Sequence, residues 1–94
     1  MAVKKVFISG KVQGVGFRFH AHEEAVKLGL KGWVRNLSDG RVEILVSGNE
    51  KEIKDMIKWA HRGPQTARVE KVEVQDTNEA PTEAFYIKRE GDTS

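Results

Sequence analysis

The chain contains no cysteine among its 94 residues. A disulfide, a thiolate nucleophile and a zinc–sulfur site are therefore excluded, and the absence suits a reducing cytosol. The N-terminal residues Met-Ala-Val-Lys-Lys lead into an expected strand and contain no long apolar core, so we expect neither a signal peptide nor a membrane span. These absences predict a cytoplasmic protein with no membrane partner.

The chain also lacks a large excess of charge of either sign, because its formal net charge is only +2. Its distribution is uneven: residues 1–48 hold eight Lys and Arg against four Asp and Glu, whereas residues 49–94 hold eight against ten. Local positive potential in the first half favours capture of a small anionic substrate. Neither a basic run nor a basic helix face is evident, so we expect no nucleic-acid partner.

The length suits one small domain that buries a core without metal or disulfide support. With 38% hydrophobic and 32% charged residues, the chain should be soluble and compact. We expect a single domain over residues 1–94, acting as a monomer, with its core at about residues 3–89 and a frayed tail at residues 90–94.

The segment Gly10–Arg18 reads Gly-Lys-Val-Gln-Gly-Val-Gly-Phe-Arg and joins an apolar strand to a helix. Gly14 and Gly16 can take backbone angles closed to other residues, so consecutive N–H groups can point at one oxyanion. The free amides that open the next helix add to the attraction. Arg18 supplies a planar cation that matches two phosphate oxygens. The segment predicts an anion pocket.

Two common nucleotide motifs are excluded here. A Walker loop needs Gly-Lys followed by Ser or Thr at the helix start, where this chain has Phe17 and Arg18. The dinucleotide fingerprint is missing because the glycine spacing differs and 94 residues cannot hold a doubly wound sheet. From spacing alone, a flexible connection with an incidental surface arginine remains an equal alternative.

The same segment resembles the phosphate-binding signature of the acylphosphatase family. Residues 32–36, Gly-Trp-Val-Arg-Asn, followed by Gly40, Val42 and Gly48, are similar to that family's second signature at the expected spacing. The resemblance covers about residues 3–89. One departure is Gln65, where the family more often has proline; this position is remote from both signatures and concerns only a loop conformation.

Hydrophobic periodicity predicts the elements of the fold. Strands are expected at residues 3–9, 31–37, 41–47, around 69–74, and 84–88, and helices at residues 17–28 and from 50 to the stop at Gly63-Pro64. Asn49 with Glu52 resembles a capping box at the second helix. A change of parity between Val69 and Val72 suggests a bulge or a late start in the fourth strand. The last strand should pack Phe85 and Ile87.

The order strand, helix, strand, strand, helix, strand predicts an α+β, ferredoxin-like two-layer sandwich with an additional C-terminal strand. Its antiparallel-dominated sheet would be covered by two helices. This topology brings both signature segments to one end of the sheet. The third strand should separate the first two, so the segments would lie about two strand spacings, or roughly 10 Å, apart.

The resemblance implies an acylphosphatase that hydrolyses the carboxyl–phosphate bond of small acyl phosphates to a carboxylate and inorganic phosphate. It implies that Arg18 and Asn36 are catalytic, with Arg18 binding the phosphate oxygens and Asn36 orienting the attacking water. The substrate phosphate would take the proton of this water, which explains why no protein base is evident. The resemblance implies neither a metal nor a cofactor. The phosphate would be cradled by the main-chain amides of Gln13, Gly14, Val15, Gly16, Phe17 and Arg18.

Other interpretations remain open. Arg18 could be a solvated charge, and Asn36 could simply stabilise the hairpin that follows it. A noncatalytic module that binds a phosphorylated metabolite or RNA is the alternative function, because similar sandwiches read RNA through aromatic residues on central strands. An RNA platform needs several aromatic residues on the central strands, and Phe7 alone does not provide them.

The histidines and large aromatics have simpler roles. His20 and His22 lie about 200° apart around a helix, so they cannot easily face one metal ion. We expect surface or packing roles for both and for His61. The remaining large aromatics are expected in the core or at its edge: Phe19, Trp33 and Trp59.

Overall fold

Five strands and two helices follow one another in the computed structural model, which describes residues 1–89. They agree in type and order with the expected elements, and their ends differ by no more than two residues. The tail predicted at residues 90–94 lies outside the described residues. In chain order the elements are β1 (Ala2–Lys11), α1 (Phe17–Lys27), β2 (Lys31–Asn36), β3 (Val42–Gly48), α2 (Glu50–Arg62), β4 (Arg68–Asp76) and β5 (Tyr86–Ile87).

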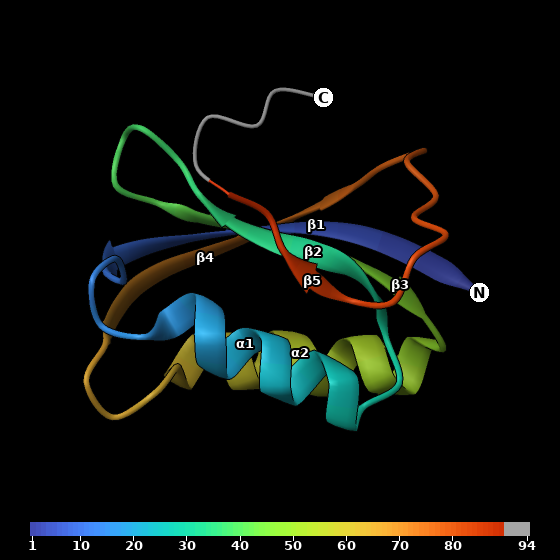
Figure 1. Cartoon of the computed structure of the whole chain (residues 1–94), viewed down its shortest axis with the longest axis horizontal. Coiled ribbons are helices and arrows are strands. Elements are labelled where there is room, and N and C mark those ends of the chain that lie inside the picture. Colours follow the sequence, from blue (N-terminus) through green and yellow to red (C-terminus); the bar gives the residue numbers. More distant parts are fainter. Residues whose placement is uncertain (90–94) are drawn as a thin grey trace.

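The strands form one sheet in the order β4-β1-β3-β2-β5. The pairs β1/β3, β1/β4 and β2/β3 are antiparallel, and β5 adds to β2 in parallel at the edge. Both helices cover the same face of this sheet (Figure 1). The ferredoxin-like α+β sandwich with an additional strand is therefore confirmed. Within residues 1–89, neither helix is long and apolar enough to cross a membrane.

An apolar core fills the space between the sheet and the helices. In α1, Phe17, Ala21 and Ala25 recur every four residues, so they share one face and are all buried. Each large aliphatic side chain buried there contributes roughly 1.5–3 kcal/mol. The strands and α2 supply the other members, chiefly Val6, Ile8, Val34, Val42, Ile44, Val46, Ile53 and Met56.

The start of α2 differs from the expected capping box. Asn49 occupies the N-cap position with an extended backbone, but its side chain does not bond to a helix amide. Its Nδ2 instead donates to Oε1 of Glu52 at 3.1 Å. In a capping box this carboxylate would accept from the backbone N–H of Asn49, and here it accepts from the side-chain amide of the same residue.

The fourth strand contains the bulge that its change of parity suggested. Ser9 pairs with Lys71 and Gly10 pairs with Val69, which leaves Glu70 as the extra residue of β4. Of the two residues expected to pack in the last strand, only Phe85 is buried, at 4% exposure, and it directly precedes β5. Ile87 was expected to pack as well, but it is 37% exposed because β5 is a two-residue strand at the sheet edge.

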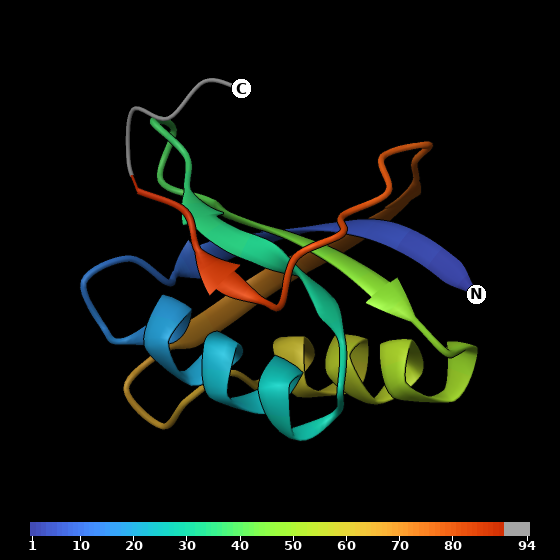
Figure 2. The same ribbon diagram turned by 45° about the vertical axis from the view of Figure 1, so that its right-hand side comes forward.

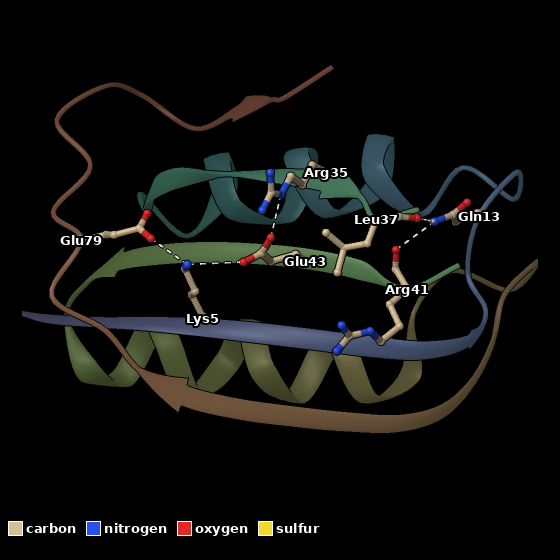
Figure 3. Close-up of polar contacts among 7 residues, drawn as sticks. All are labelled: Lys5, Gln13, Arg35, Leu37, Arg41, Glu43 and Glu79. Atoms are coloured by element: carbon tan, nitrogen blue, oxygen red, sulfur yellow. Dashed lines mark hydrogen bonds and ion pairs between the residues drawn. The ribbon is translucent and has the colours of Figure 1, made fainter. Parts of the chain in front are cut away.

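The outer face of the sheet carries a buried carboxylate. Glu43 on β3 is 2% exposed, and its Oε1 accepts from Nε of Arg35 at 2.6 Å, while Nζ of Lys5 lies 3.6 Å from its Oε2. Lys5 also pairs with Glu79 at 2.6 Å. Figure 3 shows Lys5 lying between the two carboxylates. The segment that contains Glu79 runs from β4 to β5 on this side (Figure 2). Every residue of β3 is buried.

This network makes stability depend on pH at the alkaline end. The hydrogen bond to Glu79, followed by the charge of Glu43, raises the pKa of Lys5 above its ordinary value of 10.5. The folded state therefore holds this proton more tightly than the unfolded state, so the stabilisation is complete below pH 10.5 and is lost as pH rises through the folded pKa.

We expect Lys5→Met to lower the free energy of unfolding at neutral pH by at most about 1 kcal/mol, because Lys5 is partly exposed. The difference from wild type should shrink above pH 10.5. Urea unfolding between pH 7 and 12 measures it, with Lys54→Met on the exposed side of α2 as the control. A Lys5 effect that stays constant over this range contradicts the assignment.

Candidate active site

The loop between β1 and α1 presents the positive end of a helix. Gly16 is the N-cap of α1, and in the described structure no side chain caps the first turn and no acidic residue lies in it. Helix amides at this end carry partial positive charge, which no carboxylate of that turn compensates. An anion at the loop would therefore meet both the free amides and the helix dipole.

A glycine is required at position 16 because of its backbone conformation, and not because a side chain would lack space. Its φ of 79° and ψ of 14° are left-handed, a conformation that L side chains rarely adopt. An added Cβ would lie 3.5 Å from the ring of His20, an ordinary contact. The glycine thus lets the chain turn from β1 directly into α1 and brings Arg18 to the first turn of the helix.

Arg18 and Asn36 line one pocket, although they come from different elements. Arg18 lies in α1, and Asn36 is the last residue of β2. The pocket has a volume of about 220 Å³. This agrees with the expectation that both segments meet at one end of the sheet, with β3 between β1 and β2. The pocket is lined by Val12, Gly14, Gly16, Phe17, Arg18, Phe19, Asn36 and Ile87.

Four of the six predicted phosphate-binding residues line this pocket: Gly14, Gly16, Phe17 and Arg18. The side chain of Phe17 is 1% exposed and packs on Trp59 with ring centroids 5.2 Å apart, so only its backbone can serve a ligand. Gln13 and Val15 are not in the lining. Nε2 of Gln13 donates to two carbonyls of the β2–β3 turn, and the carbonyl of Val15 accepts from Oγ1 of Thr66 at 2.6 Å.

Phe19 and Ile87 were not predicted as site residues. Phe19 was expected in the core or at its edge, but it is 57% exposed and lines the pocket. Helical geometry could have predicted this exposure. Phe19 lies two residues after the buried Phe17, which is about 200° around the helix, so it faces away from the core. Ile87 joins the pocket through the pairing of β5 with β2, which sequence periodicity did not reveal.

The histidines have packing and surface roles, as expected. Nε2 of His22 lies 3.1 Å from the carbonyl oxygen of Phe85, and Nδ1 of His20 lies 3.3 Å from a carboxylate oxygen of Glu23. His61 is exposed near the end of α2. Arg18 is thus the one titratable side chain that lines the pocket in the part of the chain that the structure describes.

A larger hollow of about 610 Å³ lies between the two helices. Its charged lining mixes both signs, so it offers no concentrated field for an anion. It contains neither signature segment. The lining residues are Glu24, Lys27, Asp55, Lys58, Trp59, His61 and Arg62.

Comparison with known proteins identifies the family. The family model described as Acylphosphatase matches residues 4–87, nearly the whole of this chain. The chain belongs to the acylphosphatase family. An acylphosphatase from Pseudomonas paraeruginosa is 48% identical over 83 residues, which cover 88% of this chain and 91% of that protein. An acylphosphatase from Thermococcus kodakarensis is 49% identical over 80 residues, covering 85% of this chain and 88% of its own length.

Solved acylphosphatase structures share the architecture. The crystal structure of acylphosphatase from Bacillus subtilis superposes with a TM-score of 0.88 at 35% identity and covers 94% of this chain and 99% of that chain. The fold also occurs within a longer protein: full-length HypF, in its phosphate- and nucleotide-bound form, matches with a TM-score of 0.85 at 32% identity, although the match spans only 12% of that chain. The acylphosphatase resemblance of the two signature segments is confirmed.

Proposed function

We propose that this acylphosphatase hydrolyses the carboxyl–phosphate bond of small acyl phosphates, with the main-chain amides of residues 13–18 and the guanidinium of Arg18 holding the phosphate. Asn36 orients the attacking water. The family supports the hydrolase activity. One observation supports the residue roles: a single pocket at an uncapped helix start is lined by both Arg18 and Asn36.

The reaction demands charge stabilisation more than a strong nucleophile, because the carboxylate is a good leaving group. Water forms a bond to phosphorus as the bond from phosphorus to the acyl oxygen breaks, and the carboxylate leaves with that electron pair. Negative charge spreads over the equatorial phosphate oxygens, where preorganised amides and Arg18 lower the barrier. The amide of Asn36 can both donate to and accept from the water. The phosphate itself takes the proton of the water.

The mouth of the pocket suits the acyl part of such a substrate. Phe19 and Ile87 are both large, exposed and apolar, and both line the pocket beside Arg18. A substrate whose phosphate lies on Arg18 would place its acyl group near this apolar rim. Burial of that rim by an apolar acyl group is favourable.

No observation favours the RNA-binding alternative. An RNA platform of this fold needs aromatic faces on the central strands that are open to bases. Trp33 is 7% exposed, with the guanidinium of Arg35 and the ammonium of Lys88 near its ring at 5.1 and 4.7 Å. The ring of Phe7 has the guanidinium of Arg41 at 5.0 Å from its centroid. The protein's own cations already occupy the positions at which bases would stack.

Hydrolysis of benzoyl phosphate, with a chelator present, tests the proposal. We expect turnover by wild type and a loss of about 10²-fold in kcat for Asn36→Ala, the usual effect of removing one transition-state donor. Inhibition by inorganic phosphate should change little, because Arg18 and the amides remain. Asn78→Ala, which changes an exposed asparagine outside the pocket, is the matched control.

Either of two results contradicts the proposal: no turnover by folded wild type, or full turnover by Asn36→Ala. We also propose that the enzyme works as a monomer, because all residues assigned to the site lie on one chain. We propose a cytoplasmic location because a chain without cysteine suits a reducing compartment. Specific activity that falls when the enzyme is diluted in the same assay would contradict the monomer.

A further inference from the structure

We infer that Gln13 is a positioning residue that holds Asn36 at the correct distance from the phosphate-binding loop. This inference rests on the proposed function. The side-chain amide of Gln13 reaches from the loop after β1 to the turn after β2. It therefore links the two segments that supply the proposed phosphate site and the proposed water site.

The link consists of two short hydrogen bonds from one nitrogen. Nε2 of Gln13 donates to the carbonyl oxygen of Leu37 at 2.7 Å and to that of Arg41 at 2.9 Å. Figure 3 shows the amide directed at both carbonyls. An amide NH₂ group has two protons, so both are used in this link. The side chain is part-buried, so these hydrogen bonds are stronger than exposed ones.

The two acceptors close the turn next to Asn36. Leu37 directly follows Asn36, and its N–H donates to the carbonyl of Arg41 at 2.8 Å. The carbonyl of Leu37 also accepts from Gly40 at 3.2 Å. Gln13 thus bonds to the residue pair that ends the β2–β3 ladder, one step beyond the pairing of Asn36 with Val42.

The sheet itself does not provide this link. β3 lies between β1 and β2, so no ladder bond joins the strand before the loop to the strand that ends at Asn36. Small rotations of β3 would therefore change the distance between Arg18 and Asn36. A cross-link of two hydrogen bonds at the open ends of these strands opposes that motion, and misplacement of a catalytic group by about 1 Å can cost up to 10²-fold in rate.

A role confined to the turn would be largely redundant. Asp39 already braces the same turn, since its carboxylate accepts from the N–H of Arg41 at 3.1 Å and from Nε of Arg41 at 2.9 Å. Gln13 adds a connection from the turn to the loop. The expected consequence of losing it is therefore catalytic, beyond any loss of stability.

Gln13→Met keeps the length of the side chain and removes both donors. We expect kcat for benzoyl phosphate to fall about 10-fold, within the range for a displaced catalytic group. The inhibition constant of inorganic phosphate should stay within about 3-fold, because the main-chain amides and Arg18 are retained. A merely structural role would change the unfolding midpoint in urea but would not separate kcat from phosphate binding in this way.

A double-mutant cycle with Asn36→Ala decides whether Gln13 acts through Asn36. In the Asn36→Ala background, Gln13→Met should change kcat by less than about 2-fold, because no positioned amide remains to be lost. An equal factor in both backgrounds would overturn the inference, as would wild-type kcat in Gln13→Met. These outcomes differ from failure of the proposed function, which is an inert wild type or a fully active Asn36→Ala single variant.

If Gln13→Met does not fold, a pair of other variants at position 13 tests the same inference. The ammonium of Gln13→Lys can donate to both carbonyls, whereas the carboxylate of Gln13→Glu cannot donate and would face two oxygens. We expect the Lys variant to retain kcat within about 3-fold of wild type and the Glu variant to lose at least 10-fold. Equal kcat values for the two would overturn the inference.

Discussion

Replacing Arg18 by alanine is expected to lower kcat for benzoyl phosphate by about 10²–10³-fold. The transition state spreads charge over the phosphate oxygens, and Arg18 is the one titratable side chain that lines the pocket within residues 1–89. Its loss leaves only main-chain amides to hold that charge. Inorganic phosphate should also inhibit the variant much more weakly than wild type, which separates this prediction from the one for Asn36.

Two further variants make the Arg18 experiment specific. Arg18→Lys keeps the charge but loses the planar fork, so its kcat should lie between those of wild type and Arg18→Ala. Arg62→Ala removes an exposed arginine at the end of α2, outside the pocket, and should keep nearly full activity. Circular dichroism checks that all variants are folded. An Arg18→Ala variant with wild-type kcat would contradict the assignment of the anion loop.

The architecture was predictable from the sequence because its signals are local. Apolar spacing such as Phe17, Ala21 and Ala25 depends only on helical geometry, and the parity change in β4 marked its bulge. The order of elements then restricts the topology to few choices. For this reason the sequence alone predicts that Arg18 and Asn36 meet at one end of the sheet.

The remaining features depend on contacts between segments far apart in the chain. The side chain of Gln13 bonds to residues 24 and 28 positions away, and a polar residue in a loop carries no sequence signal for such partners. The partners of the buried Glu43 are likewise far apart in the chain, since Lys5 comes from β1 and Arg35 from β2. Ile87 reaches the pocket only because β5 adds to β2. Tertiary structure, and not periodicity, places these residues.

The second signature segment has a structural role as well as the catalytic one proposed for its asparagine. Gly32 lies in β2 opposite Val46, four residues before Asn36. Its φ is 137°, and an added Cβ would lie 1.8 Å from the carbonyl oxygen and 2.7 Å from the carbonyl carbon of Leu45. Both atoms belong to the backbone of β3, so no side-chain rotation can relieve the clash. With this backbone angle, β2 can pair with β3 only because residue 32 has no side chain.

We therefore expect Gly32→Ala to lose more than about 4 kcal/mol in the free energy of unfolding, a loss that few single substitutions cause. Small domains have only about 5–15 kcal/mol in total, so the variant should be largely unfolded or strongly shifted in urea. Gly29→Ala is the matched control: its φ is 72°, but nothing lies within 4 Å of the added Cβ. That variant should lose only about 1–2 kcal/mol, the cost of the left-handed conformation. If the two variants lose the same amount, then the backbone angle alone limits residue 32, and the contact of an added Cβ with the backbone of Leu45 adds nothing to the cost.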